Sequence, residues 1–84
     1  MPVKINYRWE VTSWGETQLH VGEGWHCGSY KPLHGGKKWS ASRAGGFSNH
    51  FVSEEKSREF LLDVARFHLL SISPDLELGD EVQP

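Results

Sequence analysis

The chain has few of the residues that define several common protein classes. It contains one cysteine in 84 residues, so no disulfide can form within it and nothing in its cysteine content indicates secretion. Its first ten residues, MPVKINYRWE, hold no apolar signal core. No apolar run approaches the roughly 18 residues that a membrane span needs. We therefore expect a cytoplasmic protein that makes no contact with a membrane.

Acidic residues are absent from residues 24–53, a stretch that holds four Lys or Arg and three His. They gather instead in residues 54–84, where eight Asp or Glu outnumber three Lys or Arg, and the net charge is −2. This asymmetry is typical of a basic binding surface beside an acidic segment. Four positive charges make a weak field, however, and many ordinary surfaces carry as many.

The first third of the chain predicts a β-hairpin. Residues 4–12 alternate, with Ile5, Tyr7, Trp9 and Val11 on one face, and residues 17–25 continue the pattern with Leu19, Val21 and Trp25. A three-residue loop at residues 14–16, with Gly15 in a left-handed conformation, pairs Val11 with Leu19 and Trp9 with Val21. Gly22 and Gly24 then leave bare backbone on the outward face, beside Lys4, Arg8, His20 and His26.

Residues 31–38, KPLHGGKK, are expected to form a loop because Pro32 removes a backbone donor and two glycines permit a reversal. Residues 38–44 and 47–52 predict a third strand and a short fourth. A two-residue turn at Gly45 and Gly46 puts Phe47 and Phe51 on the face of Ser40 and Ser42, opposite to Trp39.

Residues 52–71 predict a helix that begins after Ser53, a favourable N-cap followed by two glutamates. Phe60, Leu61, Val64 and Phe67 form its apolar stripe, and His68 is expected to be a core histidine on the same side. Leu62 and Leu69 lie seven residues apart on the outer side, where a partner or the C-terminal segment is needed to cover them. Pro74 ends the helix, and residues 74–84 are expected to be a loosely held acidic tail.

These elements predict an α+β fold with a three- to four-stranded antiparallel sheet packed by one C-terminal α-helix. One domain spans residues 1–73, and residues 74–84 form the flexible tail. The order of strands, W-x-A at residues 39–41, G-F at residues 46–47 and a glutamate-rich helix start resembles small sheet-plus-helix DNA-binding units of plant transcription factors and of integrase N-terminal arms. Those units typically carry a more basic sheet.

The sequence contains no convincing metal or catalytic motif. His26 and Cys27 are adjacent, so they point to opposite faces of a strand, and the five His show no short-spaced ligand pairs. Cys27 shares the parity of Val21 and Trp25, which predicts a buried thiol. We expect no bound metal, no cofactor and no enzymatic activity.

Two functions remain open. In the first, a basic and aromatic sheet face and loop bind nucleic acid, with cations on phosphates and aromatic rings, Trp14 among them, stacking on bases. The residues expected there are Lys4, Arg8, His26, Tyr30, Lys31, Lys37, Lys38, Trp39 and Arg43. In the second, the chain is a protein-binding accessory or inhibitor of the kind that phages and mobile elements encode. Its contacts are then Leu62 and Leu69, a sheet edge or the acidic tail, in one version within a homodimer.

Overall fold

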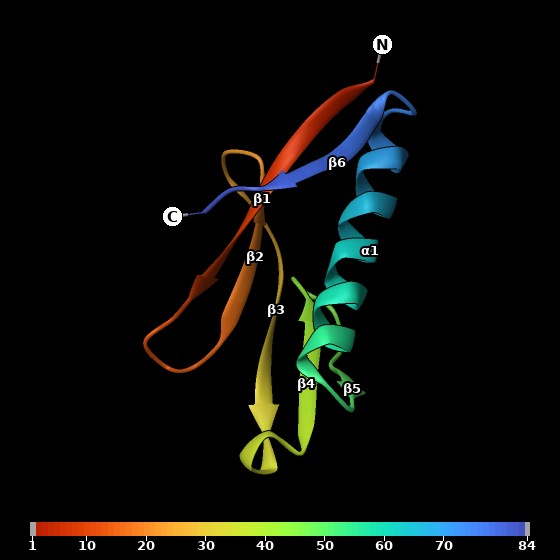
Figure 1. Ribbon diagram of the computed structural model, residues 1–84. Coiled ribbons are helices and arrows are strands. Elements are labelled where there is room, and N and C mark those ends of the chain that lie inside the picture. Colours follow the sequence, from red (N-terminus) through yellow and green to blue (C-terminus); the bar gives the residue numbers. More distant parts are fainter. Residues whose placement is uncertain (1, 84) are drawn as a thin grey trace.

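Six strands and one α-helix build the structure, a computed structural model that describes residues 2–83 (Figure 1). The elements are β1 (Val3–Val11), β2 (Thr17–Val21), β3 (Trp25–Leu33), the 3₁₀ turn η1 (His34–Gly36), β4 (Lys38–Arg43), β5 (Asn49–Phe51), α1 (Glu54–Ile72) and β6 (Leu76–Glu81). The strand order is β5-β4-β3-β2-β1-β6. The α+β class with one helix agrees with the sequence prediction, whereas the prediction of three to four strands is wrong.

Strand β6 corrects the prediction of a flexible tail. It lies parallel to β1, with Leu76 opposite Val3 and Leu78 opposite Ile5, so the sheet is mixed and not purely antiparallel. Helix α1 makes the crossover that carries the chain from β5 at one edge to β6 at the other (Figure 1). Leu76 and Leu78 are half-buried against the core, and the residue between them is exposed. This is the alternation of a strand, which the acidic composition of the segment made hard to recognise in the sequence.

A turn at residues 22–24 separates β2 from β3, where the sequence predicted one continuous strand. Gly22 has a φ of 66°, in the left-handed region that glycine adopts without strain. Its amide donates to the Asn6 carbonyl at 2.8 Å, which ties the turn to β1. Gly22 and Gly24 therefore reverse the chain and do not form a bare platform on a strand.

The β1–β2 register differs by two residues from the predicted one. Val11 pairs with Thr17 and Trp9 with Leu19, so the connection spans residues 12–16. Thr12 stabilises this longer loop, because its hydroxyl donates to the Glu16 carbonyl at 3.1 Å and accepts from the Glu16 amide at 3.0 Å. An even shift preserves the faces of a strand, so Ile5, Tyr7 and Trp9 pack against the core as predicted. Val11, expected on the same buried face, lies at the end of β1 and is 76% exposed.

The register of the short strand β5 also differs. Phe51 pairs with Trp39 and lies on the same face, not on the face of Ser40 and Ser42. Its ring centroid is 5.3 Å from that of Phe60 on α1, so the contact with the helix selects this register.

The predicted loop at residues 31–38 is mostly strand. β3 runs to Leu33 and pairs with β4 as far as Lys38, which leaves η1 and Lys37 as the connection. Pairing of β3 with β2 ends at Tyr30, so Pro32 has one open side. A missing N–H costs no ladder hydrogen bond on that side, which explains why proline is accepted within the strand.

The helix buries a face that overlaps the predicted stripe in part, since Leu61 is buried and Phe60 and Val64 are half-buried against the core. Ser53 is the expected N-cap, since its side chain accepts from the Lys56 amide at 3.2 Å. The buried helix residues are Ser57, Leu61, Ala65 and Leu69, which pack on Leu19, Val21, Cys27, Tyr30 and Ala41 of the sheet. Because small residues alternate with leucines at a spacing of four, the helix lies close to the sheet on this face.

Four predictions for the helix faces are thereby corrected. Leu69, expected on the outside, is 5% exposed, and Phe67, expected inside, is 77% exposed. Leu62 is half-buried and packs against the core. His68 is exposed and not a core residue, and its ring stacks on Trp25 with centroids 4.2 Å apart.

Candidate functional site

The residues predicted to bind nucleic acid lie on two different faces of the sheet. Alternation along the strands puts Lys4, Arg8, His26, Lys31 and Lys38 on the face that α1 leaves uncovered. The same alternation puts Tyr30, Trp39 and Arg43 on the face that the helix covers, and Lys37 lies in the connection after η1. The structure therefore does not assemble one surface that is both basic and aromatic.

Tyr30 is a core residue and is 1% exposed, which corrects the prediction that it stacks on bases. Its hydroxyl donates to Glu54 Oε2 at 2.8 Å and accepts from Arg58 Nε at 2.7 Å, so it joins β3 to the first turns of α1. The Arg58 guanidinium lies 5.1 Å from the Trp9 ring centroid and covers that ring as well. Trp39 is half-buried beside Tyr30, with ring centroids 5.9 Å apart. Trp14, by contrast, is 70% exposed in the β1–β2 loop.

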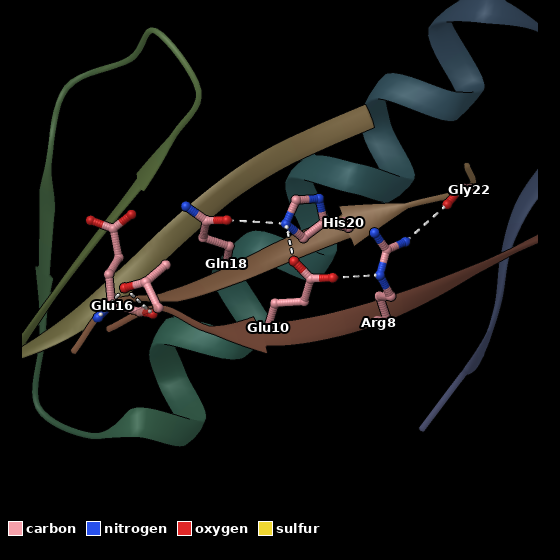
Figure 2. A network of polar contacts seen from close by, with 7 residues as sticks. Arg8, Glu10, Glu16, Gln18, His20 and Gly22 are labelled. Atoms are coloured by element: carbon pink, nitrogen blue, oxygen red, sulfur yellow. Dashed lines mark hydrogen bonds and ion pairs between the residues drawn. The ribbon is translucent and has the colours of Figure 1, made fainter. Parts of the chain in front are cut away.

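A polar network occupies the uncovered face at β1 and β2 (Figure 2). Arg8 Nε donates to Glu10 Oε1 at 2.9 Å, and the other Glu10 oxygen lies 3.2 Å from His20 Nε2. The hydrogen bond from Arg8 lowers the pKa of Glu10, which keeps that carboxylate charged. The positive charge of Arg8 is thus paired with a neighbouring acid, which weakens it as a ligand for phosphate.

Two histidines at the centre of this face are stacked. The rings of His20 and His26 are 5.3 Å apart with an interplanar angle of 23°, and Nε2 of His26 is buried without a hydrogen-bond partner. Burial is the largest influence on His20 and lowers its pKa, although the nearby Glu10 acts in the opposite direction. His20 is therefore mainly neutral at pH 7 and adds little positive charge to the uncovered face.

An aromatic groove lies on the other face, between one side of α1 and the ends of β3 and β4. Its volume is about 710 Å³. Its lining residues are Trp25, Cys27, Arg43, Ala44, Gly45, Phe60, Asp63, Val64, Phe67, His68 and Ser71. The helix residues among them recur every three or four positions, so they form one stripe beside the buried one. We call this site the aromatic groove.

The aromatic groove has apolar walls with charged groups among them. Trp25 from β3 stacks on His68 of α1, which joins the two elements that line the groove. Phe67, next to His68 on α1, also lines the groove and remains 77% exposed. Arg43 and Asp63 are both exposed, and no ion pair joins them in the part of the chain that the structure describes. Such a surface can hold an apolar group while the charged groups orient polar atoms next to it.

Cys27 lies in the lining of the groove but is chemically quiet there. It is 2% exposed, and its thiol donates to the Leu61 carbonyl with Sγ 3.7 Å from the oxygen. Burial raises the pKa of the Cys27 thiol to about 11. The thiol is therefore protonated at neutral pH and packs as a small apolar group, as its strand parity predicted.

The sequence carried a signal for the aromatic groove that was assigned to the core. The helical spacing predicts that the stripe of Phe60, Leu61, Val64 and Phe67 faces the sheet, whereas Phe60, Val64 and Phe67 line the groove. The sequence predicts Arg43 as a nucleic-acid-binding residue because of its charge. Its position beside α1 depends on the register of β4, which the sequence pattern does not specify. Among residues 2–83, no three His, Cys, Asp or Glu side chains are grouped closely enough to hold a metal ion.

No known protein family, curated protein or solved structure matches this chain. Within residues 2–83, no helix is both long and apolar enough to cross a membrane.

Proposed function

We propose that this chain is a small, non-enzymatic module that binds a protein through the aromatic groove. The observation that carries the proposal is Phe67, a large apolar side chain that is 77% exposed at the boundary of a groove with aromatic walls. Exposed apolar surface of this kind, bordered by polar groups, is typical of a protein-interaction site. The proposal keeps the protein-binding alternative of the sequence analysis and moves its surface away from Leu62 and Leu69.

The chemistry of the aromatic groove favours an apolar side chain of the partner, in particular an aromatic one. The volume of about 710 Å³ lies within the roughly 300–1,000 Å³ of common binding pockets. Trp25, Phe60 and Phe67 offer ring faces and edges, with which an aromatic ring packs favourably in offset or edge-to-face arrangements. Arg43 and Asp63 provide a donor and an acceptor for the backbone of the bound segment.

The test uses N-acetyl-phenylalaninamide as a probe, followed by amide chemical shifts of the ¹⁵N-labelled protein. We expect millimolar additions to move resonances of Trp25, Val64, Phe67 and their neighbours, because these residues form the walls. Phe67→Asp should abolish the response. Val11→Asp should not alter it, since Val11 is 76% exposed on β1, which β2 and β3 separate from β4. Absence of any shift, or shifts scattered over the whole chain, would refute the proposal.

A second candidate, nucleic-acid binding, rests on the uncovered face of the sheet. That face carries Lys4, Arg8, Lys31 and Lys38 against the acids Glu10 and Glu77. The excess of positive charge is small, and the exposed aromatic residue that remains for stacking is Trp14 at the rim. The uncovered face therefore supports phosphate contacts more than base contacts.

Salt dependence tests the second candidate. If the uncovered face binds phosphates, fluorescent DNA or RNA should bind at about 50 mM salt and dissociate at about 200 mM, because counterions compete for the cations. The Lys31→Ala/Lys38→Ala variant should weaken this binding, and Lys56→Ala on the helix should leave it unchanged. An affinity that does not respond to salt or to the two lysines would contradict the nucleic-acid proposal.

A further inference from the structure

We infer that the protein partner of the aromatic groove is a second copy of this chain, with Phe47 of each copy inserted into the groove of the other. The inference rests on the proposed function, because it names the occupant of the same site. Three observations carry it: the position of Phe47, the charges in the groove, and the amount of surface that the single chain leaves exposed.

Phe47 lies in the connection between β4 and β5 and is 94% exposed. The same connection provides Ala44 and Gly45, which form part of the groove lining. A two-fold axis beside this connection brings the groove of each copy opposite Phe47 of the other. Gly45 has a φ of 76° and the Gly46 amide donates to the Arg43 carbonyl at 2.9 Å, so Phe47 follows directly after a turn and lies two residues beyond the groove lining. A two-fold interface needs such a self-complementary patch, in which a projection and a recess lie side by side.

The charges in the aromatic groove are self-complementary as well. Arg43 from β4 and Asp63 from α1 both line it. Within the described residues Arg43 takes part in no ion pair, whereas Asp63 pairs with Arg66 of its own helix at 2.9 Å, so Arg43 of a second copy would share that carboxylate with Arg66. Across a two-fold axis, Arg43 of one copy meets Asp63 of the other, and the contact occurs twice. A strongly acidic or basic partner would instead match a groove of one sign. The balanced pair therefore favours a second copy.

The surface of the chain is larger than its mass predicts. A folded chain of 9.6 kDa exposes about 5,100 Å² on average, whereas this chain exposes 5713 Å², an excess of roughly 600 Å². Its radius of gyration is 13.0 Å, against about 12 Å for a compact domain of this length. The excess approaches the roughly 800 Å² that each partner buries in a standard interface.

Light scattering after size exclusion tests the inference. At concentrations of tens of micromolar, we expect the wild-type chain to show twice its mass of 9.6 kDa. Phe47→Asp should weaken dimerisation at least about 30-fold, the effect of removing an aromatic hot spot. Val11→Asp, a change at another exposed apolar residue, on β1, should leave the dimer intact. A 9.6 kDa species at every concentration would overturn the inference, and so would a dimer that persists in Phe47→Asp.

A charge exchange locates the interface independently of Phe47. Arg43→Asp and Asp63→Arg each bring like charges together across the two-fold axis, so each variant alone should be monomeric. A mixture of the two restores both pairs of opposite charge and should form a mixed dimer. Both residues are exposed, so neither change is expected to unfold the chain, which circular dichroism verifies. A mixture that stays monomeric while wild type dimerises would place the dimer interface elsewhere and contradict the inference.

The outcomes separate this inference from the proposed function. If the chain is a monomer under all conditions and N-acetyl-phenylalaninamide still moves the groove resonances, the groove binds another protein and the inference is wrong. If the chain dimerises and the amide binds in the groove, excess N-acetyl-phenylalaninamide should compete with Phe47 and convert the dimer to monomer. If the amide does not bind and no dimer forms, both proposals are wrong.

Discussion

Gly28→Ala is expected to lower the melting temperature by roughly 10 °C or more. A Cβ atom at Gly28 on β3 would lie 2.5 Å from the Ser42 carbonyl oxygen, 2.8 Å from Leu61 Cδ2 and 2.9 Å from Arg43 Cα. Two of these three atoms are backbone of the neighbouring strand, which cannot move without breaking its ladder. Overpacking of this kind lowers the free energy of unfolding by about 1–3 kcal/mol. Each kcal/mol lost lowers the melting temperature of a domain of this size by roughly 4–8 °C.

Gly24→Ala is the matched control for that experiment. No atom lies within 4 Å of the position that its Cβ would take, and its backbone is outside the left-handed region. We therefore expect a change in stability within about 0.5 kcal/mol. Thermal unfolding followed by circular dichroism measures both variants. Equal melting temperatures would show that α1 does not approach β3 as closely as the contact between Gly28 and Leu61 requires.

The same close approach explains why the sequence predicted the helix but not its buried face. The predicted stripe of Phe60, Leu61, Val64 and Phe67 satisfies helical spacing as well as the observed stripe of Leu61, Ala65 and Leu69 does. The second stripe is the buried one because alanine at position 65 and glycine at position 28 let the backbones come together. Larger aromatic residues at that contact would hold the layers apart. Hydrophobicity alone does not distinguish the two stripes, since the choice depends on size at a tertiary contact.

The sheet was predictable where one strand carries its own pattern. Tyr7 and Trp9 alternate with charged residues, and β1 forms with the predicted faces. The predicted strand count is too low for two reasons. The turn at residues 22–24 divides a stretch whose alternation continues on both sides of it, and β6 lies in the segment that was expected to be a tail. Tyr30 was assigned to the surface because its neighbours Lys31 and Pro32 are polar or loop-forming, whereas the strand that contains all three points the ring inward.

The candidate site was predictable only in its parts. Arg43 and the helix aromatics were each singled out from the sequence, in unrelated roles. They meet because β4 pairs with β3 in a register that no local pattern specifies. Cations and aromatic rings that look interleaved between residues 24 and 43 are sorted onto opposite faces by the two-residue period of a strand. The same short-range alternation that predicts a strand therefore separates the residues of the expected nucleic-acid surface.

Removal of residues 74–84 is expected to lower the free energy of unfolding by about 3–5 kcal/mol, which is the second large effect. The sequence interpretation of a loose tail predicts no change, whereas the structure places β6 against β1 and α1. Truncation exposes Ile5 and deletes Leu76 and Leu78, and full burial of one leucine stabilises a fold by about 1.5–3 kcal/mol. It also removes two backbone hydrogen bonds, from the Val3 amide to the Asp75 carbonyl and from the Val82 amide to the Tyr7 carbonyl, each with a nitrogen–oxygen distance of 2.7 Å. A total loss of about 3–5 kcal/mol is a large fraction of the roughly 5–15 kcal/mol that stabilises a native domain.

Single substitutions distinguish the stability that β6 contributes by packing from any effect of shortening the chain. Leu78→Ala should lower the free energy of unfolding by about 1 kcal/mol, in proportion to the half-buried side chain that it removes, and should therefore lower the urea midpoint. Glu77→Ala, next to it on the exposed side of the strand, should leave the midpoint unchanged. A truncated chain that keeps the wild-type midpoint would show that the acidic segment does not pack as a strand. A lower urea midpoint in the truncated chain, and a lower midpoint in Leu78→Ala than in Glu77→Ala, would show that β6 packs at the edge of the sheet. The alternating leucines of this segment would then determine its structure, despite its acidic composition.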